Sequence, residues 1–324
     1  MMHGPEKSDS LIVPRKPANK AASAVAELVE GRSGTEGNAM MQSMVRTQSR
    51  EAVSQAQSRI REAVNRNRKE KLTALLHHID VDILRAGFLS LKKSASAGVD
   101  QMMWGMYEAA LEENLLCLHR RLHTGAYRAL PSRRVYIPKA DGKQRPLGIA
   151  AMEDKIVQAA TVMILTPIYE AEFLGFSYGF RPRRSQHDAL DALAYGIKGR
   201  NIWWILDADI SRFFDTINHE WLVRFLEHRI GDRRIIRLIQ KWLKAGVLEQ
   251  GERIDTLQGT PQGAVISPLL ANIYLHYVYD LWVQSWRKRH ASADMIVVRY
   301  ADDTIVGFQY VSGVDPVIPD TASH

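Results

Sequence analysis

The pattern of hydrophobic and polar positions changes several times along the chain, and its first part has no regular period. Residues 1–56 are rich in Ser, Ala, Gly, Gln and Lys. A segment of this composition buries too little apolar surface to offset the entropy lost on ordering. We therefore predict that 1–56 form a poorly ordered leader.

A helical period begins after this leader, and we predict that 57–130 form a helical N-terminal extension. Five apolar side chains recur there at spacings of three or four residues and so share one helical face: Tyr107, Leu111, Leu115, Leu118 and Leu122. Gly125 follows as a helix stop. Further helices are predicted over 152–166 and 271–289, and one or two helices over 219–244. The first of these is expected to end before Pro167.

Strands are predicted mainly in 131–324. The run RRVYIPKADGKQRPLGI, at 133–149, has alternating apolar positions on both sides of Asp-Gly, which is typical of a β-hairpin. A second hairpin is predicted over 247–257, with Gln-Gly at its turn. The runs MIVVR (295–299) and TIVGF (304–308) flank a third tight turn.

Another run, IWWILDADI at 202–210, is almost continuously apolar and ends in acids. This pattern predicts a buried strand that ends at a functional site. On a buried strand, Trp203 and Trp204 are expected to pack in the core rather than to stack on nucleic-acid bases.

The charge balance of the chain favours an anionic partner. There are 43 Lys+Arg against 36 Asp+Glu, a formal net charge of +7, and cations that contact phosphates release counterions. The run RIREAVNRNRKEK, at 59–71, is basic and has few apolar residues. A solvated helix face and an RNA-binding arm both fit this composition, so both interpretations stay open.

Cys117 is the single cysteine, which excludes an intramolecular disulfide and a cysteine-rich zinc site. It suits a reducing compartment, and we predict a cytoplasmic protein. The N-terminus lacks the apolar core of a signal peptide. The longest nearly apolar stretch, 156–169, is too short to span a bilayer, so no membrane partner is expected.

Three acids lie where a catalytic metal site is expected. Asp209 lies at the end of the predicted buried strand, and Asp302 and Asp303 occupy the tip of the third hairpin. Carboxylates at such positions cost free energy if they are buried without partners. Mg²⁺ offsets that cost because it prefers carboxylate oxygens. Two such ions about 4 Å apart can activate a hydroxyl group and stabilise a leaving phosphate oxygen.

Five sequence blocks reinforce this prediction. They are, in order, RRVYIPKADGKQRPLGI, FSYGFRPRRSQHDAL, DADISRFFDTINHEWL, GTPQGAVISPLLANIYLH and VVRYADDTIVGF. With these blocks the chain resembles the group II intron-encoded reverse transcriptases, also called intron maturases, from about Arg46 to Tyr310.

The resemblance implies an α+β fold with the fingers and palm of a right-hand polymerase, over 131–324, in which the palm sheet carries helices. It implies an RNA-directed DNA polymerase of a mobile element, a nucleotidyltransferase that also acts as a splicing maturase. The implied partners are an intron RNA template, a DNA primer and deoxynucleoside triphosphates. The implied cofactors are two Mg²⁺ ions, with Mn²⁺ as a substitute.

The roles of the acids carry over by position. Asp209, Asp302 and Asp303 match the catalytic, metal-binding aspartates of the family. Ile210 matches the residue whose carbonyl can also face a metal. Asp215 matches a family acid that is not a metal ligand.

The nucleotide-binding residues carry over in the same way. Lys139 and Arg145 match the fingers residues that hold the triphosphate, a role that suits a lysine and a forked guanidinium. Gln262 matches a nucleotide-contacting residue, beside a glycine that lets the backbone approach closely. Phe214 matches the aromatic residue under the incoming sugar that rejects a 2′-hydroxyl. We expect Phe213 to point the other way, into the core, from an extended segment.

The second block helps to line the template path in the family, and it adds to the candidate RNA contacts. These candidates are Arg59, Arg61, Arg66, Arg68, Lys69, Arg183 and Arg184. For the last two, a contact with the RNA backbone and a solvated surface position both stay open.

The chain departs from the family after the third hairpin. The tail 311–324 has two prolines and no helical stripe, so we expect the family's thumb to be absent and polymerisation to be impaired. An RNA-binding splicing cofactor without polymerase activity, or a non-functional fragment, stays open as an alternative. A homodimer also stays open.

Overall fold

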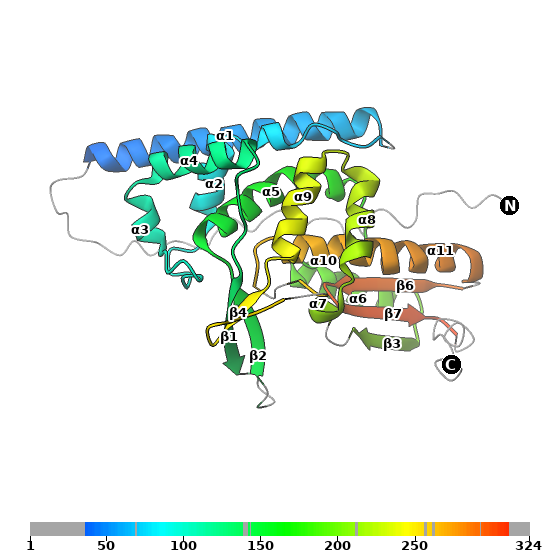
Figure 1. Cartoon of the computed structure of the whole chain (residues 1–324). Helices are drawn as coiled ribbons and strands as arrows, with labels where there is room; N and C mark the ends of the chain where they lie inside the picture. Colours follow the sequence, from blue (N-terminus) through cyan, green and yellow to red (C-terminus); the bar gives the residue numbers. More distant parts are fainter. Residues whose placement is uncertain are drawn as a thin grey trace.

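The fold mixes helices and strands, as the sequence predicts (Figure 1). The computed structural model describes residues 36–68, 70–138, 142, 144–210, 213–255, 258–260, 263–291 and 293–310. The helices are α1 (Glu36–Arg66), α2 (Val81–Ser90), α3 (Trp104–Glu108), α4 (Leu111–His123), α5 (Met152–Glu170), α6 (Gln186–Gly199), α7 (Phe213–Thr216), α8 (His219–Arg229), α9 (Arg233–Leu243), α10 (Ser267–Leu275) and α11 (Leu281–His290). Two short turns, the 3₁₀ turn η1 (Leu76–His78) and the π-helical turn η2 (His276–Asp280), accompany them. The strands are β1 (Ser132–Pro138), β2 (Gln144–Ile149), β3 (Trp204–Asp209), β4 (Val247–Glu249), β5 (Glu252–Ile254), β6 (Met295–Tyr300) and β7 (Asp303–Phe308).

A helical body forms the larger part of the molecule. It consists of α1, α2, α4, α5, α8, α9 and α10, whose apolar side chains share one core. Gly87 allows α2 to approach α5 closely, because a Cβ atom there would lie 2.8 Å from the carbonyl oxygen of Ile156. None of the described helices combines the length and the apolar character that crossing a bilayer requires.

The first helix begins earlier than expected. α1 starts at Glu36, so 36–56 are helical and the predicted leader is corrected over this range. Ala56, Ile60 and Val64 are spaced four residues apart and are buried against the body. This apolar stripe is too sparse to stand out in a polar sequence, because packing on α2 and α5 stabilises the helix more than local propensity does. Residues 1–35 lie outside the described residues.

α5 also continues further than predicted, since Pro167 lies inside it. Proline has no N–H group to donate to the carbonyl four residues earlier. That carbonyl, Met163 O, instead accepts a hydrogen bond of 3.0 Å from Nε2 of Gln57 on α1. A side chain from another helix replaces the missing donor, and the helix passes through the proline.

The strands form two sheets, with the orders β2-β1-β4-β5 and β3-β7-β6. The three predicted hairpins are confirmed as β1–β2, β4–β5 and β6–β7. Parallel pairing of β1 with β4 joins the first two hairpins into one sheet. β3 adds to the free edge of β7, antiparallel to it.

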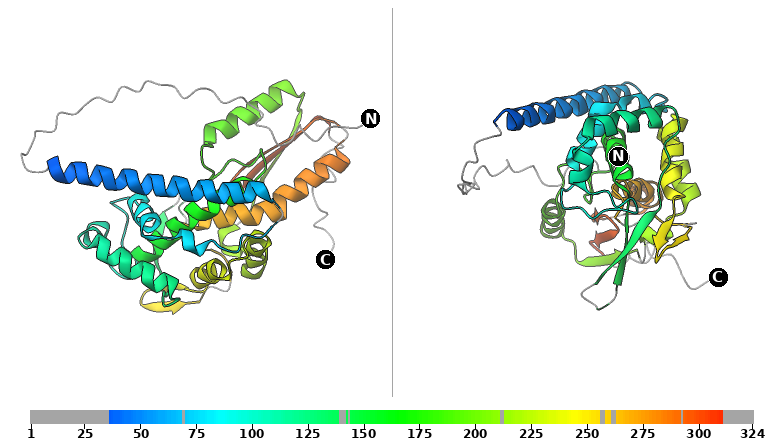
Figure 2. Two further views of the ribbon diagram at one scale, coloured as in Figure 1. Left: turned by 90° about the horizontal axis from the view of Figure 1, so that it is seen from above. Right: turned by 60° about the vertical axis from the view of Figure 1, so that its left-hand side comes forward.

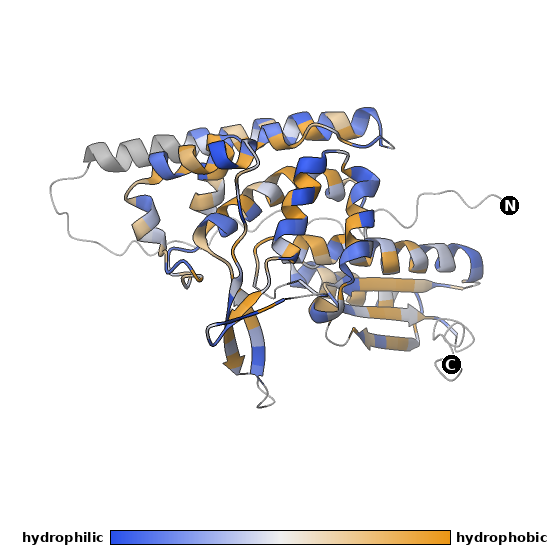
Figure 3. Cartoon of the chain, viewed as in Figure 1, coloured by the Kyte–Doolittle hydropathy of each residue, from blue (hydrophilic) through white to orange (hydrophobic). Residues whose placement is uncertain are grey.

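Helices cover both faces of the three-stranded sheet, as the view from above makes clear (Figure 2). α11 packs on one face through Val283 and Trp286, against apolar side chains of β6 and β7. α6 packs on the other face, where a Cβ atom at Gly196 would lie 2.7 Å from Cδ1 of Ile296. β6 is buried along nearly its whole length and is hydrophobic there (Figure 3).

β3 differs from its prediction as a buried strand. It is an edge strand of its sheet, and Trp203 and Trp204 are 76% and 48% exposed. The apolar run led to the prediction of a buried strand. Hydrophobicity indicates that a segment favours burial, but it does not indicate where a strand lies in its sheet. The expectation that both tryptophans pack in the core is therefore wrong.

Candidate active site at the aspartate turn

The tip of the β6–β7 hairpin is a two-residue turn. Tyr300 pairs with Asp303 in the ladder, which leaves Ala301 and Asp302 to make the connection. Ala301 has a φ of +59°, a conformation that costs a residue other than glycine about 1–3 kcal/mol. The surrounding structure must hold this turn in place. The turn places Asp302 and Asp303 at the end of the sheet.

β3 brings the third predicted acid to the same place. Asp209 is the direct ladder partner of Asp303, and such partners have Cα atoms about 4.5–5.5 Å apart. The side chains of directly opposed residues share one face of a sheet. The structure thus brings together two acids that are far apart in the sequence, with the half-buried Asp302 on the adjoining turn.

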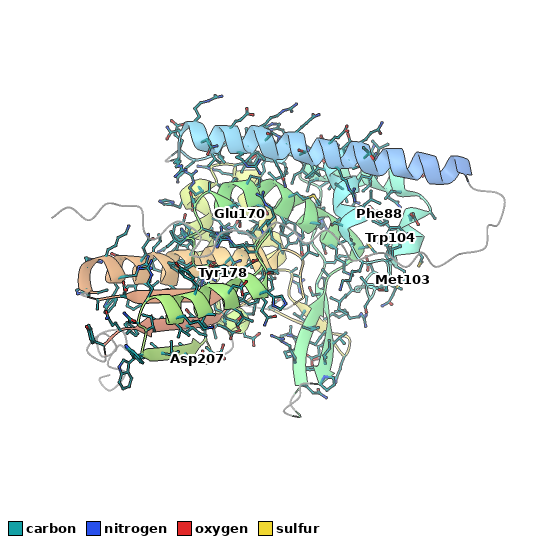
Figure 4. All side chains as sticks on the ribbon, turned by 180° about the vertical axis from the view of Figure 1, so that it is seen from behind. Phe88, Met103, Trp104, Glu170, Tyr178 and Asp207 are labelled. Carbon is teal, nitrogen blue, oxygen red and sulfur yellow. The ribbon has the colours of Figure 1, made fainter. Side chains whose placement is uncertain are left out.

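A fourth acid, Asp207, was missed by the sequence analysis. It lies two residues before Asp209 on β3, so both side chains point to the same face. Figure 4 labels it on the outer part of the sheet. The alternation in Asp-Ala-Asp could have identified it.

The four carboxylates repel one another. Partial desolvation of its carboxylate raises the pKa of Asp303, although the residue is largely exposed, and the negative charges of Asp302, Asp209 and Asp207 raise it further. Among the described residues, no ion pair with a cationic side chain is found for Asp209, Asp302 or Asp303. A cation therefore has a favourable potential at this end of the sheet.

The donors fit a hard divalent cation, because all of them are carboxylate oxygens. Within the described ranges, no three His, Cys, Asp or Glu side chains are close enough to form a ready-made metal centre. Mg²⁺ is usually held by one or two carboxylates together with substrate phosphates, and seldom by a cage made of protein alone. The arrangement fits an ion that shares its coordination with a nucleotide. Ile210 follows Asp209 and is partly exposed.

The two phenylalanines lie on α7, a four-residue helix, and not on the expected extended segment. Phe213 is 5% exposed and packs in the core, as predicted, whereas Phe214 is half-buried. Side chains of helical neighbours point about 100° apart, which is enough to separate them. The Phe214 carbonyl accepts a 2.7 Å hydrogen bond from the Thr260 N–H, so the fourth sequence block lies beside it.

That fourth block also contacts the β1–β2 hairpin. Gly263 has a φ of +105°, and a Cβ atom there would lie 3.1 Å from the carbonyl oxygen of Gly148 on β2. Arg145 is exposed on the same strand, opposite Ile137. The fourth block thus contacts the third block at Phe214 and the first block at Gly148. Lys139 and Gln262 lie outside the described residues.

The candidate RNA contacts divide into two groups. Arg61 of α1, Arg68 just after this helix and Arg183 line one groove of about 690 Å³. Glu170 also lines this groove, beneath α1 (Figure 4). Arg184 instead donates hydrogen bonds of 2.5 and 2.7 Å to the carbonyls of Gly175 and Ser177. Its role is therefore at least partly structural.

The remaining candidates of this set contribute less to the groove. Arg59 and Arg66 are exposed on α1 but are not among the residues that line it. Lys69 lies outside the described residues. The basic run therefore presents cations in more than one direction.

Comparisons with known proteins confirm the predicted family. Residues 137–315 match the family described as reverse transcriptase (RNA-dependent DNA polymerase). Protein YkfC of Escherichia coli (strain K12) is 38% identical over 252 residues, which cover 67% of this chain and 65% of YkfC. Group II intron-encoded protein LtrA of Lactococcus lactis subsp. cremoris is 37% identical over 223 residues, which cover 67% of this chain and 37% of LtrA.

An intron-associated protein of a eukaryote is similar as well. The uncharacterized 91 kDa protein in the cob intron of Schizosaccharomyces pombe is 47% identical over 146 residues, which cover 45% of this chain and 18% of that protein. The chain thus spans less than two thirds of the length of each of these three relatives.

Proposed function

The chain belongs to the reverse transcriptase family, and from this premise we propose that it carries the fingers and palm of a group II intron RNA-directed DNA polymerase. The observation that carries the proposal is the ladder pairing of Asp209 with Asp303, beside the turn that holds Asp302. In this assignment the three-stranded sheet belongs to the palm and the β1–β2 hairpin to the fingers.

Asp209, Asp302, Asp303 and the Ile210 carbonyl would hold the metal. Two bound Mg²⁺ ions, or Mn²⁺ in their place, would activate the primer hydroxyl and neutralise charge on the phosphates. The protein's own contribution is to position these oxygens on two adjacent strands and a tight turn. Such positioning supplies much of the catalysis of phosphoryl transfer.

The nucleotide would lie between the β1–β2 hairpin and α7. Arg145, with Lys139, would hold the triphosphate through charge-assisted hydrogen bonds. The half-buried Phe214 would contact the sugar, and its backbone is fixed by the Thr260 hydrogen bond. Gln262, which follows Thr260 closely in the chain, would complete the contacts with the nucleotide.

The test is primer extension on an RNA template with Mg²⁺. Asp209→Asn and Asp303→Asn should each lower the rate by at least about a hundredfold, as expected when preorganised charge stabilisation is lost. Asp294→Asn is a matched control, since Asp294 precedes β6 at its far end and its carboxylate pairs with the partly exposed Arg200 at 3.5 Å. Extension that survives both active-site substitutions would refute the proposal.

A maturase role, RNA binding in support of splicing, is a second candidate function because of the arginine groove. Arg61, Arg68 and Arg183 come from segments more than a hundred residues apart, yet they line one concavity. Guanidinium groups that converge in this way suit the phosphates of an RNA backbone.

Salt dependence of RNA binding tests this candidate. Replacing the three groove arginines by Gln should lower the slope of log affinity against log salt by about 2 for single-stranded RNA. A matched triple variant at Arg59, Arg66 and Arg237, which are exposed outside the groove, should change it less. Equal changes in both variants would show that general charge, and not the groove, binds RNA.

A further inference from the structure

A buried ion pair lies directly behind the aspartate turn. Arg299 on β6 is 1% exposed and Asp280, at the end of η2, is 0% exposed. Nε and Nη2 of Arg299 donate hydrogen bonds of 2.7 Å to the two carboxylate oxygens of Asp280. This bidentate geometry fixes the plane of the guanidinium group.

The other donors of Arg299 reach three further segments. Nη1 donates to the Ala301 carbonyl at 2.8 Å and to Oδ1 of Asn272 at 3.1 Å. Nη2 also donates to Oγ of Ser177 at 2.8 Å. A guanidinium has five N–H donors, and every one of them is used here. The group therefore has one favourable orientation.

The helix behind the sheet supplies its acceptors in a regular pattern. Asn272, His276 and Asp280 are spaced four residues apart along α10 and η2, and all three are buried. Burial lowers the pKa of His276 to about 4, so at neutral pH this neighbour of Asp280 is uncharged and does not compete with Arg299. Three polar residues on one face of an apolar helix are the sequence signal for this network.

The second sequence block is held against the turn by the same groups. Nδ2 of Asn272 donates a 2.7 Å hydrogen bond to the Gly179 carbonyl. A Cβ atom at Gly179 would lie 2.2 Å from the Ala301 nitrogen, so only glycine allows this approach. The Tyr178 N–H donates to the Arg299 carbonyl at 2.8 Å, and Tyr178 is labelled between the sheet and the helical body in Figure 4.

We propose that Arg299 is a positioning residue that holds the Ala301 carbonyl and thereby fixes Asp302 and Asp303 against Asp209. Desolvation offsets most of the attraction in a buried ion pair, so such a pair adds little net stability. The contribution of this pair is the orientation of a turn whose first residue has an unfavourable positive φ. The part of this inference that concerns metal binding rests on the proposed function.

Arg229 provides a matched comparison. It is also 1% exposed and also forms an ion pair, with the partly buried Glu172. Its Nη1 donates to main-chain carbonyls too, those of Glu70 at 3.0 Å and of Arg68. Arg229 holds the segment after α1, and none of its hydrogen bonds reaches the aspartate turn. Replacing Arg299 or Arg229 by lysine therefore removes similar hydrogen bonds in two different places.

Hydrogen–deuterium exchange of the full chain, without metal, measures the positioning directly. Arg299→Lys should raise amide exchange in 300–305 by about tenfold, because hydrogen bonds from a charged donor are lost. Arg229→Lys should raise exchange around 68–72 and leave 300–305 unchanged. Ser177→Ala removes one of the five hydrogen bonds and should raise exchange in 300–305 by a smaller factor if the lysine variant fails to fold.

Mn²⁺ titration followed by electron paramagnetic resonance gives the second measurement. Arg299→Lys should weaken binding several-fold, Arg229→Lys should leave it unchanged, and Asp303→Asn should abolish it. The inference is overturned if 300–305 exchange as in the unmodified chain in both Arg299→Lys and Ser177→Ala, or if Arg229→Lys has the same effect there. Absence of Mn²⁺ binding in the unmodified chain would count against the proposed function alone, since the exchange data still decide the positioning role.

Discussion

Carboxylates in the helical body and carboxylates at the end of the three-stranded sheet have opposite surroundings. Asp232, before α9, is 3% exposed and accepts five hydrogen bonds from Leu75, Leu76 and Arg234. Asp303 is exposed and faces other acids across the ladder. Burial alone would raise the pKa of Asp232, but hydrogen bonds from Arg234 and from main-chain N–H groups lower it to about 2. The pKa of Asp303 is instead raised.

The contrast separates groups that stabilise the fold from groups that are available to a ligand. When a carboxylate accepts many hydrogen bonds, the protein stabilises its negative charge, and the carboxylate in turn stabilises the fold. Acids that repel one another destabilise the protein slightly, and a cation relieves that repulsion. The same substitution should therefore have opposite effects on stability in the two regions.

The largest effect is expected at Asp232. Asp232→Ala should lower the free energy of unfolding by about 3 kcal/mol, because it leaves buried N–H donors of η1 without an acceptor and removes the cap of α9. Asp232→Asn keeps one acceptor oxygen and should cost less. Urea unfolding of the three proteins measures both differences, and equal stability of the alanine variant would show that Asp232 does not anchor η1.

Asp154 should give the next largest effect, with a pH signature. It is buried between Tyr127 and the Leu130 N–H, and burial raises its pKa to about 6, above the unfolded value of about 3.9. The folded state then binds the proton more tightly. The free energy of unfolding should fall by about 2 kcal/mol as pH rises from 4 to 6.

The measurement is urea unfolding from pH 4 to pH 7, with Asp154→Asn as the control. Asn cannot titrate, so the pH dependence of the unmodified chain should exceed that of the variant across this window. Parallel curves would show that Asp154 has an ordinary pKa in the folded protein.

The sequence alone predicts many of the elements in these two regions, but it does not predict which distant residues they contact. Hairpins and most helices follow from local period and turn residues, so the aspartate turn and Asp209 were located correctly. The edge position of β3 and the passage of α5 through Pro167 depend on neighbours distant in sequence, namely β7 and Gln57. Arg299 was likewise overlooked, because a single arginine in an apolar strand gives no sign of which acceptors it will meet.

A smaller effect on stability is expected at Gln57, whose side chain donates to a main-chain carbonyl of α5. Gln57→Ala should destabilise the chain by about 1 kcal/mol, since it leaves the Met163 carbonyl without a donor. In a Pro167→Ala background the backbone N–H of residue 167 can serve that carbonyl, so the same substitution should cost less. Thermal unfolding of the four proteins in this double-mutant cycle gives the coupling. Additive effects would exclude compensation for the proline.

The smallest effect is expected at the sheet end, and its sign is reversed. Asp303→Asn should stabilise the metal-free chain by about 0.5 kcal/mol, because it removes a like-charge pair with Asp209 across the ladder. Mg²⁺ at tenfold above its dissociation constant should stabilise the unmodified chain by about 1.4 kcal/mol and the variant hardly at all. The order of melting temperatures should thus invert when Mg²⁺ is added. Asp294→Asn, which instead loses its pairing with Arg200, should show no inversion. If Asp303→Asn were less stable both with and without Mg²⁺, Asp303 would belong with the stabilising acids of the body, and the contrast between the two regions would fail.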